Sequence, residues 1–195
     1  MAGASEPLAA GNDPVAVAVA DVLGRVGASP ATLGDGWLVC VDGPAGSGKT
    51  TLAEALRAAA RRPTTLVHMD DLYEGWSGLA AAPERVRSWI VRPLADGRLA
   101  TYRRYDWETG RWAEHHRIEP GGLLVLEGCG SGSASYADHV TVLAWVETSR
   151  RERLRRGIER DGAAMRERWL AWQRDEDALF ARERTRQRAD VVLGT

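Results

Sequence analysis

The sequence predicts an α/β fold built around a parallel sheet. Short apolar runs of strand length, at residues 37–41, 64–69 and 123–127, alternate with segments of helical periodicity. A glycine-rich segment lies directly between the first apolar run and a stretch of helix formers. The chain has 195 residues, of which 44% are hydrophobic and 27% charged. These values are typical of one globular domain with a sizeable core.

The N-terminal part divides into a tail and a helix. Residues 1–12 are small and polar enough to form a frayed tail. Asp13 followed by Pro14 is typical of a helix start, and the apolar face of the expected helix consists of Val15, Val19, Val22, Leu23 and Val26. Residues 27–36 end this helix, which we expect to pack on the sheet edge. We therefore divide the chain into an N-terminal tail and helix, 1–33, and a main domain, 34–195.

The glycine-rich segment, GPAGSGKT at residues 43–50, matches G-x-x-x-x-G-K-[ST] at every fixed position. Between a strand and a helix, this pattern predicts a loop whose backbone N–H groups bind the phosphates of ATP. Lys49 is the only lysine among 26 basic residues, and we expect it to reach the β and γ phosphates. Thr50 is the expected Mg²⁺ ligand. The expected ATP-binding residues are Gly43, Ala45, Gly46, Ser47, Gly48, Lys49, Thr50 and Thr51.

Two carboxylates follow the second strand, 64–69. Ligands of open parallel sheets bind at the carboxyl ends of the strands, so Asp70 and Asp71 lie where a general base or a metal ligand belongs. We expect Asp70 to be the base and, together with Thr50 and Glu127, a ligand of Mg²⁺. The alternative is that either residue only caps the next turn.

A helix is expected over residues 83–94 and ends before Gly97. Residues 98–118 predict a projecting β-hairpin that turns at Gly110 and is rich in aromatic and arginine side chains. Such a hairpin would line an acceptor pocket or, alternatively, be a solvated surface hairpin. The expected acceptor contacts are Tyr73, Tyr105, Asp106, Trp107 and Arg111.

The third strand, 123–127, ends in Glu127, a candidate Mg²⁺ ligand, and a fourth strand is expected over 140–146. Residues 149–162 form an arginine-rich helical segment that predicts a lid over ATP, with Arg153 and Arg156 acting on the phosphoryl group. A solvated charged face is the alternative. The following long helix carries a packing stripe of Met165, Trp169, Trp172, Leu179 and Phe180, and residues 190–193 form a fifth strand.

Composition excludes several other classes of function. The net charge is −1, which gives no reason to expect nucleic acid or an anionic membrane as a partner. No apolar run is long enough to span a membrane, and Glu6 and Asp13 do not fit a signal peptide. Two cysteines in apolar runs indicate a reducing compartment, so we expect a cytoplasmic protein. A homo-oligomer is left open.

These motifs together resemble the uridine kinase-like group of P-loop kinases, which is related to phosphoribulokinases and bacterial pantothenate kinases. Asp70-Asp71-Leu72-Tyr73 is similar to the family's D-x-F-Y element, whose first aspartate is the catalytic base. Further similar elements are Leu94-x-x-Gly97, Tyr105-Asp106-Trp107, Pro120 with Leu126-Glu127-Gly128, Arg153-Leu154 with Arg156, and Ala189-Asp190-Val191-Val192. The resemblance implies a sheet of five parallel strands in the order 2-3-1-4-5.

The resemblance also implies a kinase that uses Mg²⁺ and ATP to phosphorylate a hydroxyl of a small metabolite, one that is nucleoside-like in the best-known members. Gly110 stands where uridine kinases carry a histidine that reads the pyrimidine, so the acceptor is not fixed. The alternative function is an ATP-binding regulatory or scaffold module without an acceptor. A GTPase is excluded, because Asn12 is the only asparagine and the N-K-x-D motif cannot exist.

Overall fold

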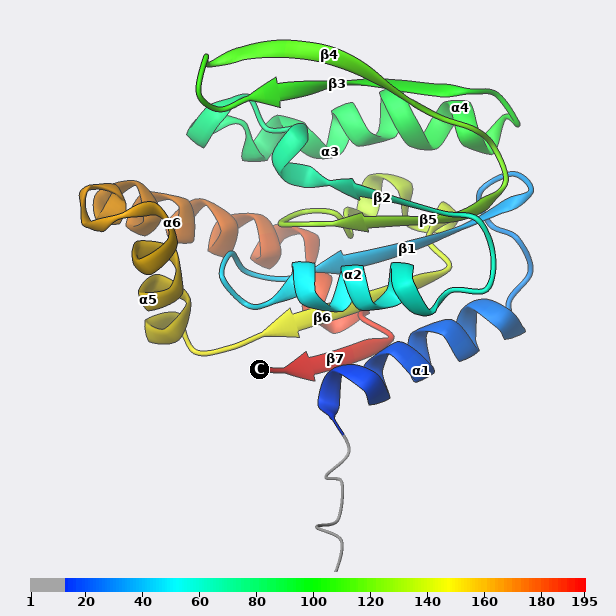
Figure 1. The fold of residues 1–195 in the computed structure, drawn as a ribbon, viewed down its shortest axis with the longest axis horizontal. Helices are drawn as coiled ribbons and strands as arrows, with labels where there is room; N and C mark the ends of the chain where they lie inside the picture. The colour runs from blue at the N-terminus through cyan, green and yellow to red at the C-terminus, as the bar shows by residue number, and fades with distance from the viewer. Residues whose placement is uncertain (1–12) are drawn as a thin grey trace, which may run out of the picture.

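The computed structural model describes residues 13–195, and the expected tail at residues 1–12 lies outside this range. Five strands form one parallel sheet in the spatial order β2-β5-β1-β6-β7, which confirms the predicted order of the five strands. The strands of this sheet are β1 (Gly36–Asp42), β2 (Thr64–His68), β5 (Gly122–Glu127), β6 (Val142–Glu147) and β7 (Val191–Gly194). Their carboxyl ends point to the same edge, toward α5 and α6 (Figure 1).

Helices cover the sheet on both faces and at its carboxyl edge (Figure 1). The longer helical elements are α1 (Pro14–Ala28), α2 (Lys49–Ala59), α5 (Arg150–Asp161) and α6 (Arg166–Glu183). The shorter ones are η1 (Met69–Asp71), η2 (Gly75–Ser77), η3 (Leu79–Ala81), α3 (Ala82–Arg85), η4 (Val86–Val91), α4 (Arg92–Ala95), η5 (Ala134–His139), η6 (Ala163–Met165) and α7 (Thr185–Arg188). The helix expected over 83–94 is thus α3, η4 and α4 in succession, with π-type bonding in η4.

The helix α1 begins as its sequence predicts. The Asp13 side chain accepts a hydrogen bond from the Val15 N–H at 3.0 Å, which is the N-cap arrangement that stabilises a helix start. The apolar face of α1 packs with α2 against one face of the sheet, in a cluster that includes Val22, Val39 and Val125.

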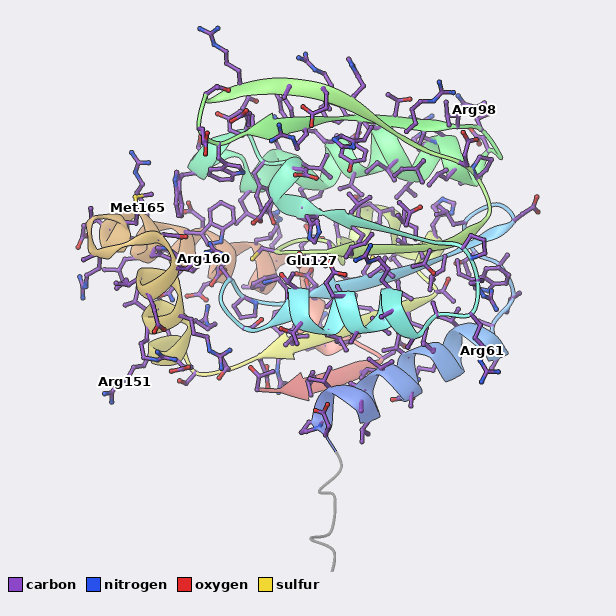
Figure 2. All side chains as sticks on the ribbon, in the orientation of Figure 1. Arg61, Arg98, Glu127, Arg151, Arg160 and Met165 are labelled. Atoms are coloured by element: carbon purple, nitrogen blue, oxygen red, sulfur yellow. The ribbon has the colours of Figure 1, made fainter. Side chains whose placement is uncertain are left out.

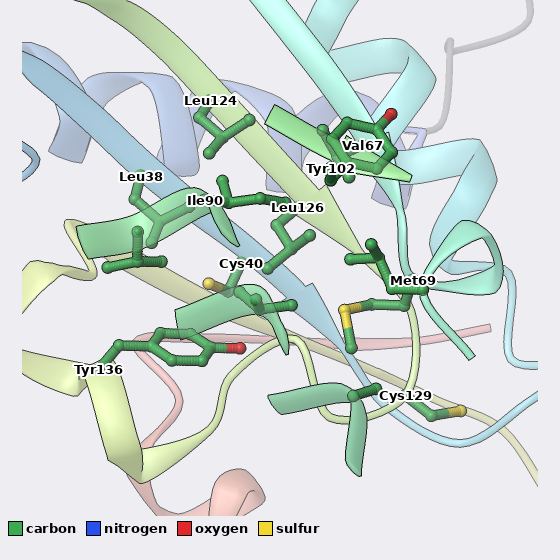
Figure 3. Close-up of a cluster of buried hydrophobic side chains, with 14 of the residues drawn as sticks. Leu38, Cys40, Val67, Met69, Ile90, Tyr102, Leu124, Leu126, Cys129 and Tyr136 are labelled. Carbon is green, nitrogen blue, oxygen red and sulfur yellow. The ribbon is translucent and has the colours of Figure 1, made fainter. Parts of the chain in front are cut away.

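Successive residues of each strand point to opposite faces, so β1 contributes to two separate cores. Val39 and Val41 face α1 and α2, whereas Leu38 and Cys40 face the opposite side. The second core is larger and includes Leu124, Leu126, Met69 and Ile90 among its labelled side chains (Figure 3). Burial on both faces explains why β1, β5 and β6 read as continuous apolar runs, whereas the edge strands β2 and β7 are partly exposed.

The expected hairpin consists of β3 (Ala100–Asp106) and β4 (Arg111–Ile118), which pair antiparallel as a separate two-stranded sheet. It lies over α3 and α4, on the side of these helices away from the main sheet (Figure 1). Trp112 anchors it there, because its ring contacts Trp89 edge to face at 5.5 Å and the Arg85 guanidinium lies 5.1 Å above it. The tip turns at Gly110, whose φ of 65° favours glycine.

Both cysteines, Cys40 and Cys129, are buried and free, in agreement with the expectation that they form no disulfide. Among residues 13–195, every helix is too short or too polar to cross a bilayer.

Candidate active site

The glycine-rich segment forms a tight loop between β1 and α2. Gly43 has a φ of 139°, and a Cβ there would lie 2.1 Å from the Val146 carbonyl oxygen of β6. At Gly46, with a φ of 79°, a Cβ would lie 2.8 Å from the Arg153 carbonyl oxygen of α5. Glycine is therefore required where the loop passes the ends of two neighbouring elements.

The loop N–H groups fall into two sets. Four of the expected nucleotide-binding N–H groups already donate within the protein: Gly43 to Asp42 Oδ1, Ala45 to Glu176 Oε2, Ser47 to the Pro44 carbonyl and Thr51 to the Gly48 carbonyl. No protein acceptor is found among the described residues for the N–H groups of Gly46 and Gly48. Those of Lys49 and Thr50 open α2, where a helix offers them no internal partner. Four N–H groups at a helix N-terminus are thus available to a phosphate.

Lys49 is buried at the bottom of this loop, with 7% of its surface exposed. Its Nζ donates to the Pro44 carbonyl at 2.9 Å and lies 3.8 Å from Cys129 Sγ. Burial by itself would lower the pKa of Lys49, but Cys129 and the surrounding carboxylates of Glu127, Glu176 and Asp42 raise it above its ordinary value. The ammonium therefore stays charged and is available for a phosphate.

Glu127 lies beside the loop, at the carboxyl end of β5. Its Oε1 accepts from the Thr50 hydroxyl at 3.2 Å and from His68 Nδ1 at 2.6 Å. The hydrogen bond to Glu127 raises the pKa of His68 despite its partial burial. Glu127 and Thr50 were both predicted as Mg²⁺ ligands, and the structure brings their oxygens together.

These oxygens fit a Mg²⁺ ion that is bound together with a nucleotide. Mg²⁺ usually takes one or two protein oxygens, substrate phosphates and several waters. Within residues 13–195, no three His, Cys, Asp or Glu side chains gather to hold a metal by themselves. Thr50 and Glu127 would hold the ion and the phosphates would complete its coordination.

Asp70 lies in η1, directly after β2, as its sequence position predicts. Asp70 is exposed to solvent, and partial desolvation by the neighbouring protein together with the charge of Glu127 raises its pKa. The positive charges of Lys49, Arg160 and His68 oppose this rise. Figure 2 shows Glu127 at the carboxyl edge of the sheet and Arg160 on α5 at the same side of the molecule.

Aromatic side chains border Asp70 on the hairpin side. The Trp107 indole N–H donates to the Asp70 carbonyl at 2.9 Å, and 41% of Trp107 is exposed. Its ring contacts Tyr105 and Trp76 edge to face, each at 5.8 Å. Trp76 in turn contacts Trp169 of α6 at 6.4 Å. Trp76 therefore connects the hairpin to α6 beside the expected base.

Two expected acceptor contacts have other partners in the structure. Tyr73 is fully buried, its hydroxyl donates to the Cys129 carbonyl at 2.7 Å, and its ring packs on Trp172. Asp106 accepts from the N–H groups of Glu108 and Thr109, so its carboxylate closes the hairpin turn. The Tyr73 side chain is therefore part of the buried core, and the Asp106 side chain caps a turn. Arg111 is exposed at the start of β4.

The arginines of α5 have different surroundings. Arg153 does not face solvent as a lid residue would: it is buried, and its Nη1 donates to Glu176 Oε1 at 2.5 Å. Arg156 lies beside the loop, where its Nη1 donates to the Gly46 carbonyl at 3.3 Å. Arg160 lies over the Trp169 ring, with its Cζ 5.6 Å from the ring centre, and its guanidinium pairs with Asp161 at 2.7 Å. The Arg153 guanidinium is thus paired with Glu176, and Arg156 is the predicted arginine of α5 that contacts the loop.

Two buried carboxylates at the loop were missed in the sequence. Asp42 ends β1 and accepts from three N–H groups, those of Gly43, Gly130 and Gly132. Burial raises the pKa of Asp42 to about 6, against the opposing effect of these three hydrogen bonds. Glu176 of α6 is the second, and burial raises the pKa of its carboxyl as well. A signal for Glu176 existed, because it follows Trp169 and Trp172 on the same face of the helix.

Comparison with known proteins identifies the fold. No protein-family model matches the sequence, and no curated protein sequence is similar to it. Solved structures are similar in fold: a possible uridine kinase from Bacillus stearothermophilus has a TM-score of 0.64 and 21% identity, covering 90% of this chain and 97% of that one. A protein named as a fructose transport system kinase from a Silicibacter species has a TM-score of 0.63 and 20% identity, covering 93% and 99%.

A third structure, D-glycerate 3-kinase from Cryptococcus neoformans, has a TM-score of 0.52 and 12% identity, covering 90% of this chain and 87% of that one. The likeness extends over nearly the whole length of the chain in all three cases, which agrees with a single α/β unit. The chain therefore has the P-loop α/β fold that these structures share, with the five-stranded parallel sheet predicted from its sequence.

Proposed function

We propose that this chain is a kinase that transfers the γ-phosphoryl group of ATP to a hydroxyl of a small metabolite. The observation that carries the proposal is the position of Asp70, two residues after His68, which pairs in register with Glu127 beside the phosphate-binding loop. A general base must lie where an acceptor hydroxyl and a bound γ phosphate meet. The solved structures of similar fold carry the names of small-molecule kinases, which supports this reading.

Each part of the site has a defined role under this proposal. The free N–H groups of Gly46, Gly48, Lys49 and Thr50 bind phosphate oxygens, and the Lys49 ammonium neutralises charge on them. Mg²⁺, when bound, neutralises charge on the phosphates, and Thr50 and Glu127 orient it. Asp70 accepts the proton of the acceptor hydroxyl.

Arg156 and Arg160 stand on the lid side of the same site. Arg156 lies against the loop at Gly46, and the positive charge of Arg160, which pairs with Asp161, opposes the rise in the pKa of Asp70. Guanidinium groups at these places stabilise the charge that develops during phosphoryl transfer. Arg153 keeps no such role, because its guanidinium is buried against Glu176.

The acceptor site lies between Asp70 and the hairpin. Trp107 and Tyr105 provide an aromatic wall that suits a planar ring, so we infer a nucleoside-like acceptor, with Arg111 available to its polar edge. The turn at Gly110 has a positive φ and presents no side chain to read such a ring. Selectivity among pyrimidines is therefore expected to be poor, since strong rejection needs a buried polar group that the wrong ligand leaves unpaired.

The test is a screen for ATP consumption with Mg²⁺ over nucleosides, pantothenate-like alcohols and sugar phosphates. We expect one class to stimulate consumption strongly and to yield a phosphorylated product by mass spectrometry. Lys49→Arg provides the control, because it keeps the charge but changes the shape of the cation. Slow ATP hydrolysis that no acceptor stimulates would instead support the regulatory module. A cytoplasmic location, expected from the sequence, remains part of the proposal.

A further inference from the structure

The carboxylate of Glu176 connects three elements that meet at the phosphate-binding loop. Its Oε2 accepts from the Ala45 N–H at 2.8 Å, and its Oε1 accepts from Arg153 Nη1 at 2.5 Å. Glu176 is 0% exposed and Arg153 is 6% exposed. One side chain of α6 thus fixes the third residue of the loop and holds an arginine of α5.

The contact is rigid. Trp172 and Leu179, on the same helix, are buried in the core, so α6 cannot carry Glu176 away without exposing them. Arg153 also lies under the loop, because its carbonyl oxygen is the atom that a Cβ at Gly46 would meet at 2.8 Å. A buried ion pair contributes little stability relative to apolar residues of similar volume. Stability alone therefore does not account for a carboxylate that is directed at a loop N–H group.

We propose that Glu176 is a positioning residue for the phosphate-binding loop: it holds Ala45 so that the free N–H groups of Gly46, Gly48, Lys49 and Thr50 converge on one phosphate. Arg153 acts as the counter-charge of Glu176 and does not contact the transferring phosphoryl group. The inference rests on the proposed function only in that the loop binds nucleotide phosphates.

A carboxylate and an amide at position 176 differ in how many donors they can accept from. This difference separates the contact to Ala45 from the contact to Arg153. A carboxylate accepts on both oxygens, whereas an amide accepts on one atom and donates on the other. In Glu176→Gln, the side chain can serve either Ala45 or Arg153 but not both. When Arg153 is replaced by Met at the same time, the amide oxygen is free to accept from the Ala45 N–H and no buried charge is left unpaired.

The experiment compares two double variants, R153M/E176Q and R153M/E176M. Both remove the buried ion pair, and their side chains at position 176 have similar length, so they differ mainly in whether Ala45 has an acceptor. ADP affinity is measured by isothermal titration calorimetry, and folding is measured by urea denaturation. We expect R153M/E176Q to bind ADP within about threefold of wild type and R153M/E176M to bind it about tenfold more weakly, the effect of one hydrogen bond.

The outcomes separate the possible roles. Equal affinity of the two double variants would overturn the positioning role, whether both match wild type or both are weak. The second case would mean that Arg153 contacts the phosphates. If R153M/E176M does not fold, R153L/E176Q and R153L/E176L provide the same comparison with a smaller apolar pair. A wild-type protein that binds no ADP would overturn the proposed function itself, and the inference with it.

Discussion

Asp42→Asn is predicted to destabilise the protein in a way that depends on pH. Asp42 Oδ1 accepts from Gly43 and Gly130 at 2.7 and 2.9 Å, and Oδ2 accepts from Gly132 at 2.8 Å. An asparagine amide has one oxygen, so its NH₂ group would face at least one of these N–H donors. A buried donor without an acceptor costs about 1–3 kcal/mol, and we expect a loss of stability of this size.

The pH dependence follows from the raised pKa of the same carboxyl, about 6 in the folded protein against 3.8 as the ordinary value. The raised pKa means that protonated Asp42 favours the folded state. Its contribution to stability is fully present below pH 3.8 and is lost as the pH rises through about 6. Between pH 7 and pH 5, wild type should therefore gain roughly 1 kcal/mol relative to D42N, which has no group to titrate at this position.

The assay is urea denaturation of wild type and D42N at pH 7 and at pH 5, with the difference between the two proteins taken at each pH. Taking differences removes the titration of all other groups. An unchanged difference would refute the reasoning, and so would a relative loss of wild-type stability on acidification. The latter result would mean that the three hydrogen bonds outweigh burial and lower the pKa of Asp42.

Four further predictions concern activity. Lys49→Arg should lose most activity, while the stability of the protein without nucleotide changes little. Steady-state kinetics and urea denaturation check the two parts, and near-normal turnover would contradict the loop assignment. Arg156→Ala should reduce kcat by up to about 10³, whereas Arg182→Ala, on the exposed side of α6, should not; similar small effects would leave α5 as a charged surface helix. The acid limb of the kcat/KM profile should lie above pH 3.8, because the pKa of Asp70 is raised; a limb at the ordinary value would remove Asp70 as the base. Acceptors should quench tryptophan emission less in Trp107→Phe than in wild type, and equal quenching would place the acceptor elsewhere.

The sheet, its strand order and the hairpin could be predicted because their signals are local or come from a family resemblance. Each buried strand is a continuous apolar run, and Gly110 marks the hairpin turn. The loop was predictable because its motif is also local. The structure shows why the motif needs Gly43 and Gly46: backbone atoms of β6 and α5 approach the loop closely at these positions.

The partners of polar side chains were not predictable in this way. Arg153 and Arg156 are three residues apart on one helix, yet only the packing of α6 decides that Arg153 is buried against Glu176. Asp42 and Glu176 are residues of types that usually lie on the surface. Nothing near them in the sequence shows that backbone N–H groups will donate to their carboxylates. Tyr73 follows Asp70 closely, but its ring packs on Trp172 and its hydroxyl donates to the Cys129 carbonyl, so the side chain is buried.

The role of Asp70 as general base is the central claim, and one comparison tests it most directly. Asp70→Asn and Asp71→Asn are assayed with the best acceptor for kcat, and with ATP alone for the dissociation constant. The account predicts that Asp70→Asn lowers kcat by about 10² to 10⁴ with ATP affinity retained, while Asp71→Asn has a small effect. A small effect of Asp70→Asn on kcat, with a large effect of Asp71→Asn, would contradict it.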